Sequence, residues 1–272
     1  MRKILALALA AVMVFTLAGC GAKDDQKTAA DNNKTANEET VEFKVGFDAE
    51  YPPYGYMDDD GSYTGFDLEL AAGVCDYWGW ELKYVPIDWD SKDMELQSGT
   101  IDCIWSGFTI NGREDDYAWS DPYVENSQVV IVAEDGGITD LAGLADKTVG
   151  VQADSAALSL LQDEEGQKEL ADTFKEIREF GNYNTAFAEL LAGTVDAVAM
   201  DIGVAQYQLE SRGEGFTLLD EYLNEEEYGI GFRKDDTELR DQVQEAVNAL
   251  KEDGTFDRLA EKYGISDLVI SD

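Results

Sequence analysis

The sequence predicts an α/β fold built from two lobes. Between residues 43 and 263, short apolar segments typical of strands alternate with segments of helical periodicity, which is the pattern of an α/β protein. About 230 residues are available for folding, enough for one large domain or two modest ones. A short internal repeat favours two: residues 96–103 and 191–197 share a Gly-Thr-x-Asp core, and in both a helix is expected to end at the glycine and a strand to follow.

The expected elements follow from the spacing of the apolar residues. In the first half we expect strands at 43–47, 81–85, 101–106 and 128–133, and helices at 67–78 and 92–97. In the second half we expect strands at 148–151, 174–180, 195–200 and 229–233, and helices at 156–162, 184–191, 237–253 and 254–263. The helix at 237–253 is amphipathic, because its apolar residues recur along one face. The acidic run at 224–227 is expected to be a solvated loop.

Polar side chains follow two of the expected strands. Ser106 ends the apolar segment 101–106, and Asp201 comes directly after the segment 195–200. In open parallel sheets, ligands bind beyond the carboxyl ends of the strands. We therefore expect Ser106 and Asp201 to mark a ligand site.

The N-terminal region is typical of an exported lipoprotein. Arg2 and Lys3 precede a continuous apolar segment, which is the order of a secretory signal peptide. The segment is shorter than the ~20 residues that span a bilayer, and the Leu-Ala-Gly-Cys motif that ends at Cys20 resembles a bacterial lipobox. We expect residues 1–19 to be removed, Cys20 to be lipidated, and 20–40 to form a disordered tether, because it lacks large apolar residues. An ordinary signal peptide with an incidental cysteine is the alternative.

The composition argues against several classes of protein. The formal net charge is −38, or −40 once Arg2 and Lys3 are removed, and a surface this acidic repels the phosphates of nucleic acids. The chain has no histidine, which excludes Ser-His and Cys-His catalysis and most zinc sites. We expect no metal and no cofactor. Apart from Cys20, only Cys75 and Cys103 remain, and the sequence leaves open whether they form a disulfide or two buried thiols.

Several motifs, in order, resemble those of the family 3 bacterial extracellular solute-binding proteins, which serve polar amino-acid ABC transporters. The matching segments are 48–56 (DAEYPPYGY), 65–70 (GFDLEL), 106–110 (SGFTI) followed by Arg113 and Glu114, 119–123 (WSDPY), 150–153 (GVQA) and 196–201 (DAVAMD). Together they span nearly all of residues 43–264. The resemblance implies a two-lobed periplasmic-binding-protein fold of type II, in which two mixed or parallel sheets are joined by two hinge strands.

The resemblance also implies how the chain divides. Lobe 1 is expected to comprise residues 43–130 and 229–272, and lobe 2 residues 135–225. The hinge strands are expected near 129–134 and 227–232. A ligand that binds between the lobes contacts both at once and thereby favours their closure.

The resemblance assigns the carboxylate of a free amino acid to Arg113. A guanidinium matches a carboxylate through two parallel hydrogen bonds, which a lysine cannot reproduce. The amides and hydroxyls of Ser106, Gly107 and Thr109 are expected to complete this cradle. The alternative is a surface arginine paired with an acidic neighbour.

The remaining ligand contacts are also implied by the resemblance. Asp201 matches the family's acceptor for the ligand ammonium, although an aspartate there can instead cap a helix. Ser155 and Ala156 lie at a turn of lobe 2 whose backbone amides can bind the carboxylate.

Three further residues are expected to surround the ligand side chain. Tyr51 and Trp89 match aromatic positions that sandwich it, and core packing is their alternative role. Asp48 matches a position that contacts a polar or basic side chain. The sequence therefore slightly favours polar or basic amino acids over acidic ones.

These observations predict an exported protein, anchored to the outer face of the cell membrane, that captures a free amino acid and delivers it to an ABC permease. We expect it to act as a monomer and not as an enzyme. Two alternatives are an enzyme on the same scaffold, similar to the cyclohexadienyl dehydratases, and a ligand-sensing receptor component. A dehydratase needs an acid or base at the ligand, and the sequence marks no such group.

Overall fold

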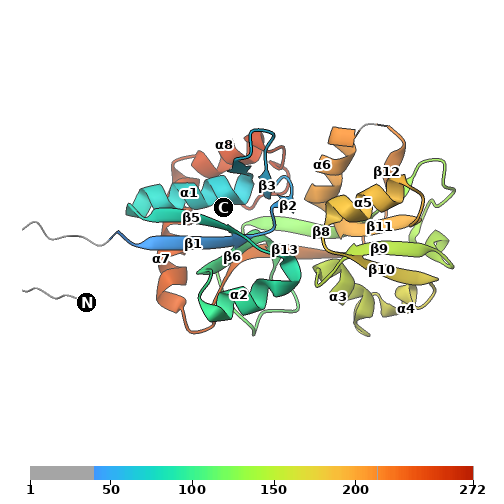
Figure 1. Ribbon diagram of the computed structural model, residues 1–272, viewed down its shortest axis with the longest axis horizontal. Helices are drawn as coiled ribbons and strands as arrows, with labels where there is room; N and C mark the ends of the chain where they lie inside the picture. Colours follow the sequence, from blue (N-terminus) through green and yellow to red (C-terminus); the bar gives the residue numbers. More distant parts are fainter. Residues whose placement is uncertain (1–39, 213, 272) are drawn as a thin grey trace, which may run out of the picture. The chain divides into compact units, whose positions relative to one another are not determined.

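The computed structural model describes residues 40–212 and 214–271 of the 272-residue chain (Figure 1). The predicted signal peptide, the predicted lipidation site Cys20 and nearly all of the predicted tether lie outside the described residues. None of the described helices combines the length and the apolar character that crossing a membrane requires.

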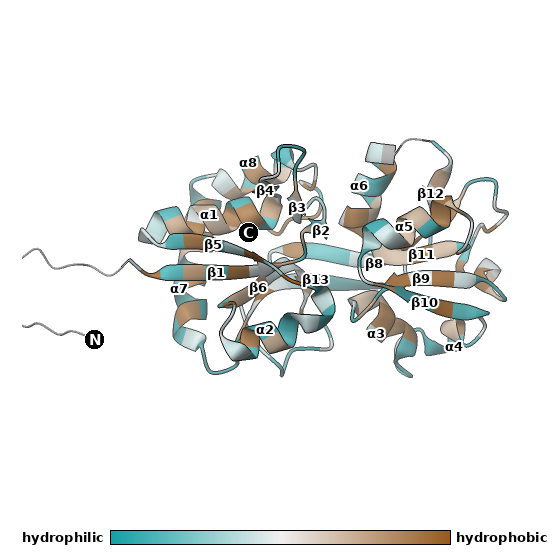
Figure 2. Cartoon of the chain, in the orientation of Figure 1, coloured by the Kyte–Doolittle hydropathy of each residue, from teal (hydrophilic) through white to brown (hydrophobic). Residues whose placement is uncertain are grey.

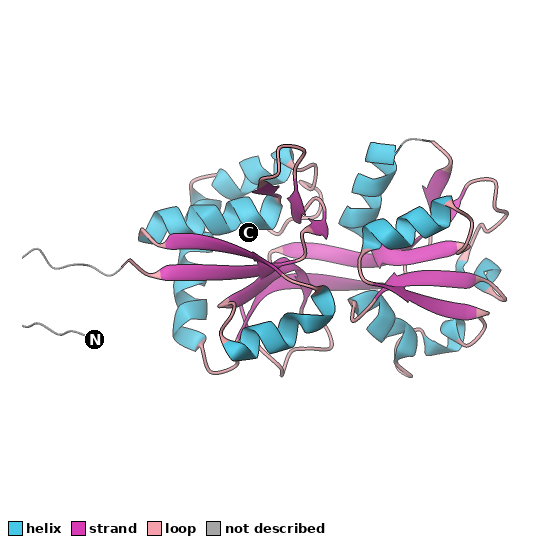
Figure 3. Cartoon of the chain, viewed as in Figure 1, coloured by secondary structure: helices cyan, strands magenta, loops and turns pink. Residues whose placement is uncertain are grey.

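One long sheet organises the described part of the chain (Figure 3). Its strands follow the spatial order β10-β9-β11-β8-β13-β6-β1-β5, with β12 paired to β8 and β7 paired to β13. The bounds are β1 Glu42–Phe47, β5 Glu81–Pro86, β6 Cys103–Thr109, β7 Ala118–Trp119, β8 Val124–Ala133, β9 Thr148–Gln152, β10 Glu176–Phe180, β11 Ala197–Asp201, β12 Phe216–Leu218 and β13 Asn224–Phe232. A separate small sheet consists of β2 Glu50–Tyr51, β3 Gly55–Met57 and β4 Tyr63–Thr64.

Helices cover both faces of the long sheet (Figure 1). They are α1 Phe66–Trp78, α2 Lys92–Ser98, α3 Ala156–Gln162, α4 Lys168–Ala171, α5 Tyr183–Leu191, α6 Ile202–Arg212, α7 Thr237–Glu252 and α8 Thr255–Lys262, with two short 3₁₀ helices at Trp89–Ser91 and Leu141–Leu144. The predicted α/β class is therefore confirmed. The predicted elements are present with shifted ends, whereas α4, α6, β7, β12 and the small sheet were not predicted.

Two strands, β8 and β13, connect the two lobes (Figure 1). Lobe 1 carries β1, β5 and β6, lobe 2 carries β9, β10 and β11, and the antiparallel pairing of residues 124–128 with 224–228 lies between them. This pairing merges the two predicted sheets into one continuous sheet. The predicted hinge ranges, 129–134 and 227–232, lie beside or overlap this crossing, and the exact division of the lobes stays a prediction.

The crossing corrects the interpretation of the acidic run. Residues 224–227 are not a solvated loop: they form the first part of β13, and Glu226 is only 5% exposed. The facing segment of β8 is equally polar, so that both strands are hydrophilic where they pair (Figure 2). Polar side chains on the inner face of this crossing are therefore buried between the lobes.

The core shows why the sheet of lobe 2 is covered on both faces. Successive side chains of a strand point to opposite faces, and in β8 Val129 and Ile131 belong to one buried cluster, whereas Val130 and Val132 belong to another. The first cluster includes Phe187 of α5. The continuous apolar segment 129–132 is what a strand buried on both faces requires.

The internal repeat has the predicted structure. Gly99 follows α2 with φ of 78°, and Gly193 follows α5 with φ of 69°, a left-handed conformation that glycine adopts without steric cost. The strand that follows each glycine pairs in parallel with the first strand of its lobe: β6 with β1, and β11 with β9. Cys75 and Cys103 are both buried free thiols, which decides between the two alternatives for this pair.

Candidate functional site

A small cavity between the lobes gathers most of the predicted ligand-binding residues. Its volume is about 10 Å³, roughly the space that one water molecule needs. It is lined by Tyr51, Trp89, Ser106, Gly107, Thr109, Arg113, Gln152, Ser155, Ala156 and Asp201. Of the predicted set, Asp48 alone is absent from this lining, and Gln152 is the one lining residue that was not predicted. A larger ligand therefore requires the lining side chains or the lobes to move apart.

Asp201 presents a carboxylate to the cavity with one oxygen already engaged. It is the last residue of β11 and is 3% exposed. Its Oδ1 accepts hydrogen bonds from Asn126 Nδ2 at 2.8 Å, Gln128 Nε2 at 2.7 Å and the Tyr228 hydroxyl at 2.8 Å. The hydroxyls of Tyr51 and Tyr183 also face this carboxylate, and among the described residues no amide of α6 donates to it. The arrangement is that of an anion kept available for a cation, and the helix-cap alternative is not supported.

The residues that hold Asp201 come from the two crossing strands. Asn126 and Gln128 belong to β8, and Glu226 of β13 accepts from the same two amide nitrogens, at 2.7 and 2.8 Å, and from the Thr109 hydroxyl at 2.7 Å. Sequence reasoning missed these residues. Strand geometry places Asn126, Gln128 and Glu226 on one face, but residues 125–128 and 224–227 are polar at every position, so no alternation in the sequence marks that face.

The β6 segment carries three of the predicted ligand residues, whose polar groups already form bonds within the protein. Ser106 lies within the strand, and its Oγ accepts from the Asp48 amide at 3.1 Å, so its own hydrogen stays available. The Gly107 amide donates to Asp67 Oδ2 at 2.6 Å and is not available. Gly107 has φ of 56°, and a Cβ there would lie 2.7 Å from the Tyr51 ring, so only glycine fits.

Arg113 lies on the turn after β6 and lines the cavity. Its guanidinium stands 5.3 Å from the centre of the Phe108 ring, and Nη1 donates to the Thr109 carbonyl at 3.3 Å. Within residues 40–212 and 214–271 it forms no ion pair, neither with Glu114 nor with Asp115. The alternative of a paired surface arginine is therefore not supported, and the guanidinium is free to bind an anion.

Tyr51 and Trp89 serve the cavity and the core at once. They are 5% and 8% exposed. The Tyr51 ring lies 5.8 Å from that of Tyr54, and the Trp89 ring meets that of Phe108 edge to face at 5.5 Å. Both rings also line the cavity. Such packing fixes their orientation, which suits walls against which a ligand side chain can lie.

The two sides of the cleft also contact each other directly. Gln152, the last residue of β9 in lobe 2, donates to Asp48 Oδ2 in lobe 1 at 2.7 Å. Asp48 thus does not line the cavity itself but binds Gln152, which does. Burial raises the pKa of Asp48 to about 6, although hydrogen bonds from the Glu50 amide and Gln152 oppose the shift.

The turn of lobe 2 that precedes α3 both caps this helix and lines the cavity. Ser155 Oγ accepts from the Leu158 amide at 3.1 Å and caps the helix. Its hydroxyl hydrogen and the Ala156 amide lie along the cavity. Asp154 adopts φ of 56°, which is uncommon for a residue with a Cβ.

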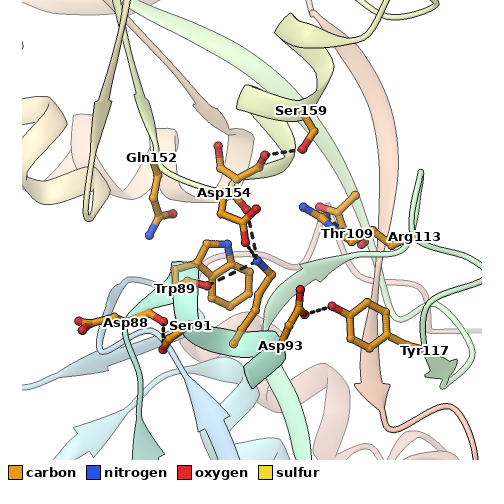
Figure 4. Close-up of polar contacts among 12 residues, drawn as sticks. Asp88, Trp89, Ser91, Asp93, Thr109, Arg113, Tyr117, Gln152, Asp154 and Ser159 are labelled. Atoms are coloured by element: carbon orange, nitrogen blue, oxygen red, sulfur yellow. Dashed lines mark hydrogen bonds and ion pairs between the residues drawn. The ribbon is translucent and has the colours of Figure 1, made fainter. Parts of the chain in front are cut away.

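An ion pair between Lys92 of α2 and Asp154 joins the lobes beside this turn. In Figure 4 the Asp154 carboxylate points toward Trp89, and it contacts Lys92 Nζ. The Lys92 side chain is 2% exposed, and its ammonium lies 5.1 Å from the centre of the Trp89 ring. Burial lowers the pKa of Lys92, and Asp154 opposes that shift. The charge of the Asp154 carboxylate is therefore compensated by the Lys92 ammonium.

The two halves of this ion pair should not be equivalent. Asp154→Ala leaves a buried ammonium without a counter-charge, whereas Lys92→Met removes the buried charge and leaves a carboxylate that is half-exposed to water. We expect Asp154→Ala to lower the free energy of unfolding by about 1–3 kcal/mol more than Lys92→Met. Urea unfolding of both variants measures the difference. Equal losses would show that Lys92 stays hydrated.

Comparison with known proteins adds independent information. The family of bacterial extracellular solute-binding proteins, family 3, matches residues 43–266. The arginine-binding extracellular protein ArtP of Bacillus subtilis (strain 168) is 30% identical over 267 residues, covering 97% of this chain and 98% of that protein.

Two solved structures show the same fold. An ABC uptake transporter substrate binding protein from Streptococcus pneumoniae with bound histidine gives a TM-score of 0.77 at 34% identity, covering 82% of this chain and 92% of that one. The ancestral amino acid-binding protein AncCDT-1, a precursor of cyclohexadienyl dehydratase, gives 0.74 at 33% identity, covering 82% and 95%. These likenesses confirm the predicted two-lobed fold class. With its motifs, its fold and the match over 43–266 in agreement, this chain belongs to the family 3 bacterial extracellular solute-binding proteins.

Proposed function

We propose that this protein captures a free amino acid in the cavity between its lobes and delivers it to an ABC permease. The observation that carries the proposal is that one cavity is lined by the guanidinium of Arg113 and the carboxylate of Asp201, neither of which forms an ion pair within the described residues. A free amino acid offers a carboxylate and an ammonium, and these two groups complement both. Because Arg113 comes from lobe 1 and Asp201 from lobe 2, such a ligand stabilises their closed arrangement. ArtP, by its name, binds arginine.

The acidic surroundings of Trp89 favour a ligand with a basic side chain. A second hollow of about 480 Å³ shares Trp89 with the cavity wall. Its carboxylates belong to Asp48, Glu50, Asp88 and Glu95, and no lysine or arginine lines it. A cationic side chain that passes Trp89 is attracted to these carboxylates. We therefore propose a basic amino acid as the preferred ligand over an acidic one.

Binding without catalysis is the better supported use of the site. A dehydratase needs a positioned acid or base, and Asp48, with its raised pKa, is the nearest candidate. Its Oδ1 and Oδ2 already accept from the Glu50 amide and from Gln152. We propose that Asp48 holds Gln152 in place and does not transfer protons to a ligand.

We further propose that the protein acts as a monomer on the outer face of the cell membrane, held there through a lipid on Cys20. The support is the order of basic residues, apolar segment and Leu-Ala-Gly-Cys motif at the N-terminus. Metabolic labelling with a fatty acid tests the anchor. Label should enter the wild-type protein and not the Cys20→Ser variant.

A thermal-shift screen tests the proposed function. The protein is unfolded and refolded to remove bound ligand, and then screened against the twenty amino acids and cystine. An amino acid at 100 times its dissociation constant adds about 2.7 kcal/mol to the free energy of unfolding, which raises the Tm by roughly 5–10 °C for a chain of this size. We expect the largest shift with a basic amino acid. If none of them shifts the Tm, the protein is not an amino-acid receptor.

A further inference from the structure

Two buried carboxylates lie next to each other at the floor of the cavity. Asp201 and Glu226 are 3% and 5% exposed, and the side-chain nitrogens of Asn126 and Gln128 each donate to both of them. Each amide thus uses one hydrogen for Asp201 and the other for Glu226. The amide oxygens of Asn126 and Gln128 are buried and have no partner among the described residues. Turning either amide over would bring its oxygen against the Asp201 carboxylate, which favours the orientations observed.

Within the described part of the chain, neither Asp201 nor Glu226 forms an ion pair with a lysine or arginine. The titratable groups that face Glu226 are Asp201 of β11, Tyr228 on its own strand, Tyr51 of β2 and Tyr183 of α5, while Arg113 lies across the cavity. Its sequence neighbours Glu225 and Glu227 are exposed on the opposite face of β13. Two adjacent carboxylates in a buried setting resist ionising together. Burial and the charge of Asp201 accordingly raise the pKa of Glu226.

Asn224 can accept a hydrogen bond from a protonated Glu226. Asn224 Nδ2 lies 3.4 Å from Glu226 Oε2, at the outer limit of a hydrogen bond, and Asn224 Oδ1 is buried without a partner in the described chain. The oxygen and nitrogen of an asparagine side chain exchange places when its amide turns over. Turned over, Asn224 accepts an O–H from Glu226 Oε2, which satisfies its oxygen and the acid together.

We propose that Glu226 carries a proton in the amino-acid-free protein and releases it when a ligand ammonium binds at Asp201. This inference rests on the proposed function. The ammonium brings a positive charge next to the pair, the O–H bond of Glu226 breaks, its proton passes to the solvent, and both carboxylates are then ionised. Glu226 does not touch the ligand. It lies next to Asp201, joined to it through the side-chain amides of Asn126 and Gln128, and its protonation changes the charge beside the ligand ammonium. Capture of the amino acid is therefore coupled to the release of a proton, and affinity increases with pH.

Proton release is measured by isothermal titration calorimetry with L-arginine, and in parallel with L-glutamine, in two buffers of different ionisation enthalpy. We expect the wild type to release up to one proton per amino acid bound. As the pH rises toward the raised pKa of Glu226, the Kd should fall by up to tenfold for each pH unit. In Glu226→Gln, amino-acid binding should release no proton from position 226, and the Kd should no longer depend on pH in this way. The matched control is Glu225→Gln, which removes the same charge from the exposed face of the same strand and should behave as the wild type.

The protonation of the free protein is checked separately, by carbon NMR of protein labelled at its glutamate carboxyl groups. We expect one resonance, absent in Glu226→Gln, to titrate well above the ordinary glutamate value of about 4.3. A resonance with an ordinary pKa overturns the inference, and so does proton release that is equal in the wild type and Glu226→Gln. If neither amino acid binds, the fault lies with the proposed function, and the NMR titration alone decides whether Glu226 holds a proton. The wild-type measurements stand even if the variant fails to fold.

Discussion

Arg113→Ala should weaken amino-acid binding by about 10²- to 10³-fold, because truncating one partner of a hydrogen-bonded charge pair costs roughly 2–5 kcal/mol. The structure supports a large effect, since this guanidinium lines the cavity and has no carboxylate partner among the described residues. Its only direct hydrogen bond there is to the Thr109 carbonyl. The fold should therefore tolerate the loss better than the ligand does.

Two further variants make this prediction specific. Arg113→Lys keeps the charge but not the two-pronged geometry, so its Kd should lie between those of the wild type and Arg113→Ala. Arg258→Ala removes an exposed arginine of α8 and should leave the Kd unchanged. Calorimetric titration with the amino acid that gives the largest thermal shift measures all three. An unchanged Kd in Arg113→Ala would mean that the ligand carboxylate is held elsewhere.

Asp67 should make the stability of the protein depend on pH. It lies in the first turn of α1, fully buried, and accepts from the Gly107 amide at 2.6 Å and the Tyr123 hydroxyl at 2.9 Å. Burial outweighs these bonds and raises the pKa of Asp67 to about 7. The unfolded chain ionises this group near 3.9. The free energy of unfolding that protonated Asp67 contributes is therefore greatest below about pH 3.9, and it is lost as the pH rises from there through about 7.

The size of the effect follows from linkage. Between pH 5 and pH 8 the wild type should lose about 2–3 kcal/mol of unfolding free energy that Asp67→Asn does not lose. Urea unfolding at several pH values measures both proteins. Asp76→Asn, an exposed site on the same helix, should follow the wild-type profile and accounts for the general repulsion among acidic residues. Parallel profiles for the wild type and Asp67→Asn would show that Asp67 is ionised in the folded protein.

Sequence reasoning placed the residues whose function depends on local geometry. Asp201 could be located because a polar residue at the end of an apolar strand faces the same edge of the sheet in any fold of this class. Ser106 lies within the other such strand, Arg113 was assigned through the resemblance to the family, and all three line one cavity. The glycines at 99 and 193 were predictable as helix ends because a left-handed conformation favours that residue.

The rest depends on contacts between remote segments. Nothing near Glu226 in the sequence indicates that it pairs with Asn126, because that neighbour is set by the register of β13 against β8. Lys92 is a similar case, since lysines are almost never buried unless paired, and its partner Asp154 lies 62 residues away. The Gly107 amide is a third case, because Asp67, which accepts its hydrogen, lies 40 residues earlier.

The position of β13 between β6 and β8 has a consequence for how the chain is assembled. All the strands of lobe 2 lie between the two crossings, so lobe 2 is an insertion within lobe 1. Lobe 1 is completed by β13, α7 and α8, and α7 packs on α1, as shown by the bond from Trp78 Nε1 to the Gln242 carbonyl at 2.9 Å. These partners are separated by 164 residues, and closing so long a loop slows folding. During synthesis, lobe 2 is therefore whole before the last strand of lobe 1 has been made.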